Sequence, residues 1–171
     1  MHVSLPCQWL DDTVWCGQHN MLAADFDSLV GNFAAVGPSY YALARTLFAP
    51  AATNRSAVLA EYYSAFGPAA SAMQRYFGFW RDFAQAAYTD PEVLARIADY
   101  ENMSSPNYVG SERAQYVMAG EVYTASVLTT ASTLLRSAEM ACGGPDSISC
   151  VRVRKSRAHL GYAAKLATAA K

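Results

Sequence analysis

Apolar residues recur at helical spacing through most of residues 38–171, and glycine and proline interrupt this pattern at a few points. These interruptions lie at Gly37-Pro38, Pro50, Gly67-Pro68 and Gly143-Gly144-Pro145. Proline cannot continue a helix and glycine suits the left-handed residue that follows one, so each interruption ends one helix before the next begins. No strand pattern repeats along this range. The sequence therefore predicts an all-α fold for residues 38–171.

We expect a bundle of about five to six helices, which gives a helical domain over residues 37–171. Polar residues that favour helix N-termini precede three of the predicted helices: Asn54 or Ser56, Thr89 or Asp90, and Thr124. The apolar face is clearest after Gly67-Pro68, where it comprises Ala69, Met73, Tyr76, Phe77, Trp80 and Phe83. Residues 1–36 show no clean periodicity and are predicted to be irregular, with a single short strand over residues 22–27.

The composition favours a folded domain with an apolar surface. Hydrophobic residues make up 53% of the 171 residues and charged residues 16%, whereas an average soluble domain has about 25% charged residues. Such a surface suits contact with another domain. No apolar run approaches the roughly 20 residues of a membrane-spanning helix, so no membrane association is expected. The first residues lack the features of a signal peptide, so either the protein stays in the cytosol or Met1 is not its true start.

Charge is unevenly distributed along the chain although the net charge is only −1. All fourteen acidic residues lie in residues 1–146, and the rest of the chain is purely basic: Arg152, Arg154, Lys155, Arg157, Lys165 and Lys171. A basic last helix can bind phosphate or an anionic sugar, or it can dock on the acidic remainder of the chain, which is the more common role. The small net charge predicts no nucleic-acid partner.

The four cysteines form two pairs that are close in sequence, Cys7 with Cys16 and Cys142 with Cys150. Neither pair has the spacing of a zinc site, and we predict no metal and no cofactor. In an oxidising compartment a Cys142–Cys150 disulfide would link two helices of a hairpin and stabilise the fold by about 2–3 kcal/mol. In a cytosol all four cysteines are expected to be free thiols.

The sequence lacks a phosphate-binding loop, a nucleophile elbow and a zinc helix, and no complete catalytic set is visible. Asp25 and Asp27 are candidate catalytic residues, because on a strand both carboxylates point to one side and glycoside hydrolysis uses paired carboxylates. The alternative is that Asp27 caps a turn and Asp25 is solvated. Tyr40 and Tyr41 are candidate substrate-binding residues, because aromatic rings stack on sugars, although aromatics at helical spacing usually form a core. We interpret His159 as a surface or packing residue.

Three parts of the chain resemble the bacterial α-glucuronidase-like family called domain of unknown function 4838. The first is Asp25-Phe26-Asp27-Ser28 followed by Gly37-Pro38-Ser39-Tyr40-Tyr41-Ala42-Leu43-Ala44-Arg45. The second, and most specific, is Leu59-Ala60-Glu61-Tyr62-Tyr63-Ser64-Ala65-Phe66-Gly67-Pro68-Ala69-Ala70. The third includes Val122-Tyr123-Thr124, Leu134-Leu135-Arg136-Ser137-Ala138, Arg152-Val153-Arg154 and Leu160-Gly161-Tyr162-Ala163.

The resemblance implies the C-terminal helical part of a carbohydrate-active, glycoside-hydrolase-like protein. Residues 1–36 would then include the end of a truncated (β/α) barrel, as a short irregular segment or a single remaining strand. A whole barrel needs about 250 residues, so this chain alone is expected to support the barrel and not to catalyse. The implied partners are the upstream barrel domain and, through the parent protein, a glycan. Whether the parent protein is secreted or active stays open. The alternative is a stand-alone helical module for protein interaction or homodimerisation.

Overall fold

The computed structural model describes residues 6–20, 33–49, 54–92, 95, 120 and 122–169. These residues form six α-helices and one short 3-10 turn, η2, with no strand among them. Their bounds are α1 Pro6–Gln18, α2 Phe33–Phe48, α3 Arg55–Ser64, η2 Gly67–Ala69, α4 Ala70–Thr89, α7 Ala125–Ala141 and α8 Ile148–Ala169. The predicted all-α fold is therefore confirmed for these residues. The predicted strand over residues 22–27 lies outside the described residues.

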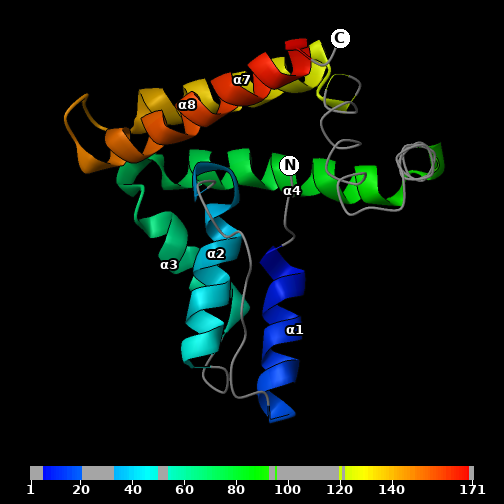
Figure 1. The fold of residues 1–171 in the computed structure, drawn as a ribbon. Coiled ribbons are helices and arrows are strands. Elements are labelled where there is room, and N and C mark those ends of the chain that lie inside the picture. The colour runs from blue at the N-terminus through cyan, green and yellow to red at the C-terminus, as the bar shows by residue number, and fades with distance from the viewer. Residues whose placement is uncertain are drawn as a thin grey trace.

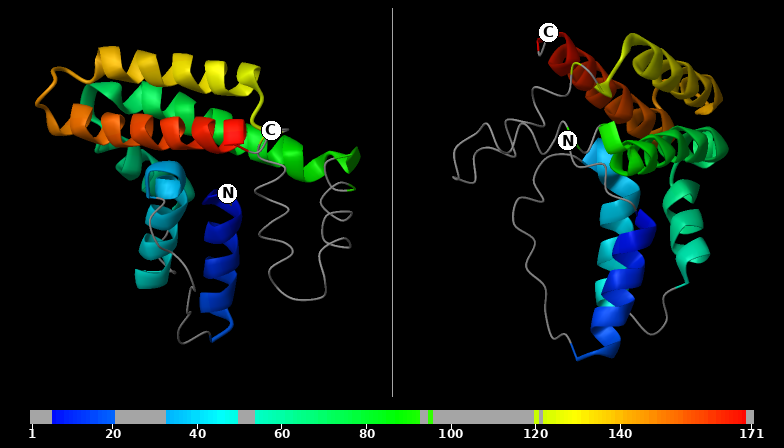
Figure 2. Two further views of the ribbon diagram at one scale, coloured as in Figure 1. Left: turned by 45° about the horizontal axis from the view of Figure 1, so that its top comes forward. Right: turned by 90° about the vertical axis from the view of Figure 1, so that its right-hand side faces the viewer.

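The helices form two groups that cross at a steep angle (Figure 1). In the first group α7 and α8 lie antiparallel to one another and rest along α4, as both views of Figure 2 also show. In the second group α1 and α2 lie side by side, and their axes point away from α4. Helix α3 contacts α2 and leads through η2 into α4, so the α3–α4 turn joins the two groups.

Local sequence signals account for most helix ends. The side chain of Asn54 accepts a hydrogen bond from the backbone amide of Ala57 at 3.0 Å and caps α3. Thr124 caps α7 in the same way, through the amide of Val127 at 3.3 Å. Each cap satisfies one of the amide groups that lack a partner in the first turn of a helix. The predicted starts of these two helices are confirmed.

One hydrophobic core joins α4, α7 and α8. Its most fully buried large side chains are Met73, Tyr76, Leu135 and Val153, and the aromatic row of α4 continues it through Phe77 and Trp80. The aromatic rings in this row meet edge to face. The rings of Tyr76 and Trp80, for example, have centroids 6.3 Å apart. Such pairs add about 0.5–1.5 kcal/mol beyond the area that they bury. The apolar face predicted for the helix after Gly67-Pro68 is thus the face that the core uses.

The N-terminal part differs from the prediction. Residues 6–18 form α1, so the segment predicted to be irregular contains a helix of 13 residues. Helix α1 packs along α2 and determines which face of α2 is covered. The buried row of α2 includes Leu43 and Thr46, and the Thr46 hydroxyl donates to the carbonyl oxygen of Ala42 at 2.8 Å. Phe48, the last residue of α2, is 87% exposed although it is large and apolar.

Candidate functional site

The four site residues predicted from the sequence fall into two groups. Asp25 and Asp27 lie outside the described residues. Tyr40 and Tyr41 are half-buried on α2. The Tyr41 hydroxyl donates to the Glu61 carboxylate, and burial together with that carboxylate raises the Tyr41 pKa. Its ring lies 5.6 Å from that of Tyr62, so Tyr41 forms part of the contact between α2 and α3.

The turn from α3 to α4 is the most constrained backbone segment at the centre of the fold. Gly67 has a φ of +52°, a left-handed conformation that side chains with a Cβ atom disfavour. A Cβ atom at this position would also lie 2.7 Å from Ser149 Oγ, in the first turn of α8. The flanking residues Phe66 and Ala69 are buried in the main core. This turn therefore needs glycine both for its backbone and for its contact with α8.

Arginine side chains of α8 reach the neighbouring helices on two sides. Arg152 donates to the carbonyl oxygen of Ala65 at the end of α3. Arg157 binds Glu139 of α7 through Nε and Nη2, at 2.8 and 3.0 Å, and also donates to the Oγ and carbonyl oxygen of Ser132. This paired geometry is stronger than a single contact because two parallel hydrogen bonds fix the guanidinium. The basic helix α8 therefore docks in part on the acidic part of the chain. This is one of the two roles that the sequence predicted for it, the other being the binding of phosphate or an anionic sugar.

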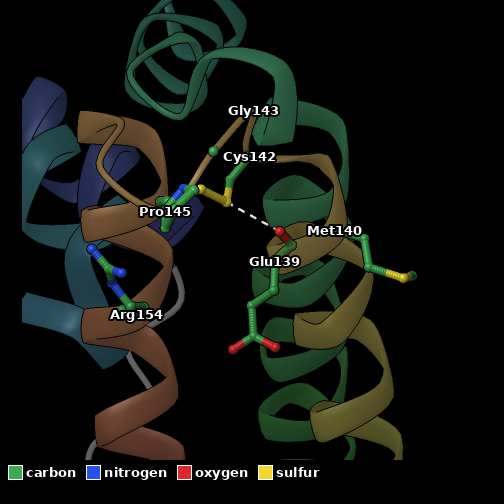
Figure 3. A pocket seen from close by; sticks show the side chains of 8 residues that line it. Glu139, Met140, Cys142, Gly143, Pro145 and Arg154 are labelled. Atoms are coloured by element: carbon green, nitrogen blue, oxygen red, sulfur yellow. Dashed lines mark hydrogen bonds between the residues drawn. A yellow bond between two sulfur atoms is a disulfide. The ribbon is translucent and has the colours of Figure 1, made fainter.

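The hollow at the α7–α8 turn is the candidate functional site. Its volume is about 640 Å³, and it is lined by residues from the end of α7, the turn and the start of α8: Glu139, Met140, Cys142, Gly143, Gly144, Pro145, Cys150 and Arg154. Cys142 and Cys150 form a disulfide with their Cα atoms 5.0 Å apart. Figure 3 shows this disulfide between the two helices, with Arg154 on the same helix as Cys150. The site therefore combines a disulfide, an open hollow and a cation.

Hydrogen bonds from Ser147 fix the geometry of the turn. The Ser147 Oγ accepts from the backbone amide of Cys150 at 3.1 Å, so Ser147 caps α8 and places Cys150 in the first turn of the helix. The same hydroxyl lies 2.9 Å from the carbonyl oxygens of both Cys142 and Gly144, to one of which it donates. The side chain of Ser147, which belongs to the turn, therefore holds the backbone of the turn that carries the disulfide.

Among the described residues, Cys16, His19 and His159 do not line this hollow. Cys7 and Cys16 lie nine residues apart on α1, which separates them by about 13 Å along the helix axis, too far for a disulfide between them. Cys16 is a free thiol. His159 is half-buried on α8, its Nε2 has no hydrogen-bond partner, and burial lowers its pKa.

Sequence reasoning identified the Cys142–Cys150 pair and missed Arg154 as its neighbour. The available signal was local, because Cys150 follows a capping serine by three residues and precedes Arg154 by four, one helical turn. Within the described ranges, no group of three or more potential metal ligands occurs and no helix is long and apolar enough to span a membrane. Comparison with protein-family models, with curated proteins and with solved structures finds no match to the chain.

Proposed function

We propose that this chain is the C-terminal helical part of a carbohydrate-active, glycoside-hydrolase-like protein, and that it supports a barrel without catalysing a reaction alone. The supporting observation is that the segments that resemble the α-glucuronidase-like family contact one another in the fold. These described segments are scattered between residues 37 and 163, and side chains from them meet at defined points.

Contacts between the first two segments hold α2 against α3. The guanidinium of Arg45 lies 3.2 Å from the carboxylate of Glu61. Gly37 faces the Tyr62 hydroxyl so closely that an added Cβ atom would overlap it. Burial raises the pKa of Tyr62, so its hydroxyl stays protonated and neutral where the two helices meet. Both ends of the Gly37–Arg45 part of the first segment are therefore fixed by residues of the second.

The second and third segments also share their contacts. Arg152 donates to the carbonyl oxygen of Ala65, and Phe66 shares a core with Leu135, Val153 and Leu160. Residues that are fixed by their neighbours specify a fold and do not by themselves specify a reaction. In this region, therefore, the residues that resemble the family are residues that pack helices together. We assign the chemistry to the barrel of the parent protein.

An activity assay and a co-expression experiment test this proposal. The purified chain is incubated with a panel of uronic-acid and neutral glycans, and released sugars are measured. We expect no turnover, and turnover that increases with chain concentration would contradict the proposal. The barrel region of the parent protein is also expressed with and without the helical chain. We expect the chain to raise the soluble yield and melting temperature of the barrel, and no effect would contradict the supporting role.

A second candidate function is a stand-alone helical interaction or homodimerisation module. The observation that favours it is the apolar end of α2, where Phe48 is almost fully exposed and Leu47 is partly exposed. Light scattering separates the two functions. A stable homodimer that Phe48→Ser converts to a monomer, while the exposed control Tyr162→Ser leaves it intact, would favour the module. A wild-type chain that is monomeric at all concentrations would contradict homodimerisation.

A further inference from the structure

The disulfide joins a helix end to a helix start across a short turn. Cys142 directly follows α7, Cys150 lies in the first turn of α8, and eight positions separate them in sequence. Each cysteine is nearly buried, at 6% and 4% exposure, yet both line the open hollow described above. A small thiol that enters the hollow therefore meets the disulfide from its accessible side.

Cys150 occupies a position that stabilises a thiolate. The first turn of a helix presents partly positive amide groups, and thiols placed there lose their proton more readily than an ordinary cysteine. Arg154 follows one helical turn later and lines the same hollow, which places a positive charge near the disulfide, although water screens this charge because Arg154 is exposed. A sulfur that is stable as a thiolate is a good leaving group in thiol–disulfide exchange.

The acidic groups near the hollow do not cancel this effect. Glu139 lines the hollow, but its carboxylate is bound by Arg157 and points away from the disulfide in Figure 3. Asp146 lies in the turn and is exposed, so water screens its charge. From residue 147 to the end the sequence contains no acidic residue.

Cys142 has a hydrogen-bond acceptor ready for its reduced form. Its Sγ lies 3.1 Å from the carbonyl oxygen of Glu139, the contact drawn as a dashed line in Figure 3. A disulfide sulfur carries no proton to donate, whereas a reduced Cys142 thiol does. Reduction would therefore give Cys142 a hydrogen bond and leave Cys150 as a thiolate in the first turn of α8.

We propose that Cys142–Cys150 is an exchangeable disulfide, which a dithiol reductant attacks from the hollow at Cys142 Sγ with Cys150 as the leaving thiolate. The attack forms a mixed disulfide between Cys142 and the reductant, and the S–S bond of the protein breaks. The second thiolate of the reductant then attacks its own sulfur in the mixed disulfide and releases Cys142, which takes up a proton. The reductant becomes a cyclic disulfide, and the two cysteines of the protein gain the two electrons.

The test compares the intact chain with two variants that remove one cation each. Arg154→Gln removes the cation that lines the hollow. Lys155→Gln is the matched control, because Lys155 is exposed on the same helix and does not line the hollow. Each protein is equilibrated at pH 8 with mixtures of reduced and oxidised dithiothreitol, quenched in acid and alkylated, and the redox state of each cysteine is read by tandem mass spectrometry. The ionisation of Cys150 is followed separately in the reduced chain, as its alkylation rate against pH.

We expect the wild-type disulfide to be reduced without denaturant, and Cys150 to ionise below the pKa of about 8.5 of a free cysteine. At pH 8, Arg154→Gln should shift the equilibrium toward the disulfide by about two- to sixfold, as half to one unit in a thiol pKa between about 7 and 8 implies. Lys155→Gln should change it by less than about twofold. Reduction that occurs only at urea concentrations that unfold the chain would overturn the proposal, and so would a Cys150 that ionises at or above 8.5 or an unchanged equilibrium in Arg154→Gln.

Discussion

Replacing Gly67 with alanine should destabilise the protein strongly, although only one methyl group is added. The left-handed backbone of Gly67 costs about 1–2 kcal/mol for a residue that carries a Cβ atom. The new atom would also lie 2.7 Å from Ser149 Oγ, and overpacking of this kind costs a further 1–3 kcal/mol or so. We therefore expect the free energy of unfolding to fall by about 2–5 kcal/mol, which corresponds to a melting temperature lower by roughly 4–20 °C.

Two further variants separate the two parts of this cost. Ser149→Ala removes the overlapping oxygen, so in the double variant Gly67→Ala/Ser149→Ala the overpacking cost should disappear while the backbone cost stays. Gly161→Ala is the control for adding a methyl group, because nothing lies within 4 Å of its Cβ position on α8. This control should gain about 0.5–1 kcal/mol, since alanine favours a helix over glycine.

Urea unfolding followed by circular dichroism measures all four proteins. A domain of this size has about 5–15 kcal/mol of stability, so even a loss of about 5 kcal/mol leaves roughly half of the molecules folded and measurable. The reasoning would be refuted if Gly67→Ala unfolded within 0.5 kcal/mol of the wild type. It would also be refuted if Ser149→Ala gave no recovery in the double variant, because the overlap would then contribute nothing.

Three further predictions concern single sites. Gly78→Ala should raise the free energy of unfolding by about 0.5–1 kcal/mol in the same urea assay, because alanine favours a helix over glycine. Only Arg81 Nη2, at 3.9 Å, lies near the added Cβ atom. A lower free energy of unfolding would mean that the added methyl group clashes with a neighbour. The free energy of unfolding should fall as the pH drops from about 6.5 toward 5. Partial burial lowers the pKa of His159 in the folded chain, so the unfolded chain takes up the proton at a higher pH than the folded chain does. The His159→Gln variant should lose this slope, and an unchanged slope would assign it to another group. Replacing both Cys142 and Cys150 with alanine should cost about 2.5 kcal/mol, from the entropy of the short loop that the disulfide closes; an unchanged melting temperature would contradict this.

The predictable part of the fold is the part that local physics determines. Asn54 and Thr124 cap their helices through side chains that act within three residues, so their roles follow from sequence alone. The aromatic row of α4 has a strict helical period, so its buried face could be read directly. The α3–α4 break was visible because glycine and proline adjoin there.

The parts that could not be predicted depend on long-range contacts. Helix α1 has no clear apolar period and carries Asp11 and Asp12 in its middle, yet it packs along α2. Without α1, the covered side of α2 could not be identified from the sequence, and the large apolar side chain of Phe48 proves to be exposed. Likewise, the α4 pattern does not show that the Cβ position of Gly78 is open, with only Arg81 Nη2 within 4 Å of it among the described residues.

The candidate site was predicted in part for the same reason. The glycine- and proline-rich turn brings the ends of two helices together, so Cys142 and Cys150 were expected to be close. Whether they bond depends on the redox environment, and the sequence left this open. The place of Arg154 in the hollow depends on how α7 and α8 pack together, which the pattern of apolar residues does not determine.

The mass of the native gene product tests the proposed function most directly. An antibody raised against residues 124–171 would detect the product in its source, and mass spectrometry of the captured protein would give its intact mass. The proposal predicts a product far larger than the 18.5 kDa of this chain, with a barrel sequence preceding the helices. A native product of 18.5 kDa would contradict it and would favour the stand-alone helical module.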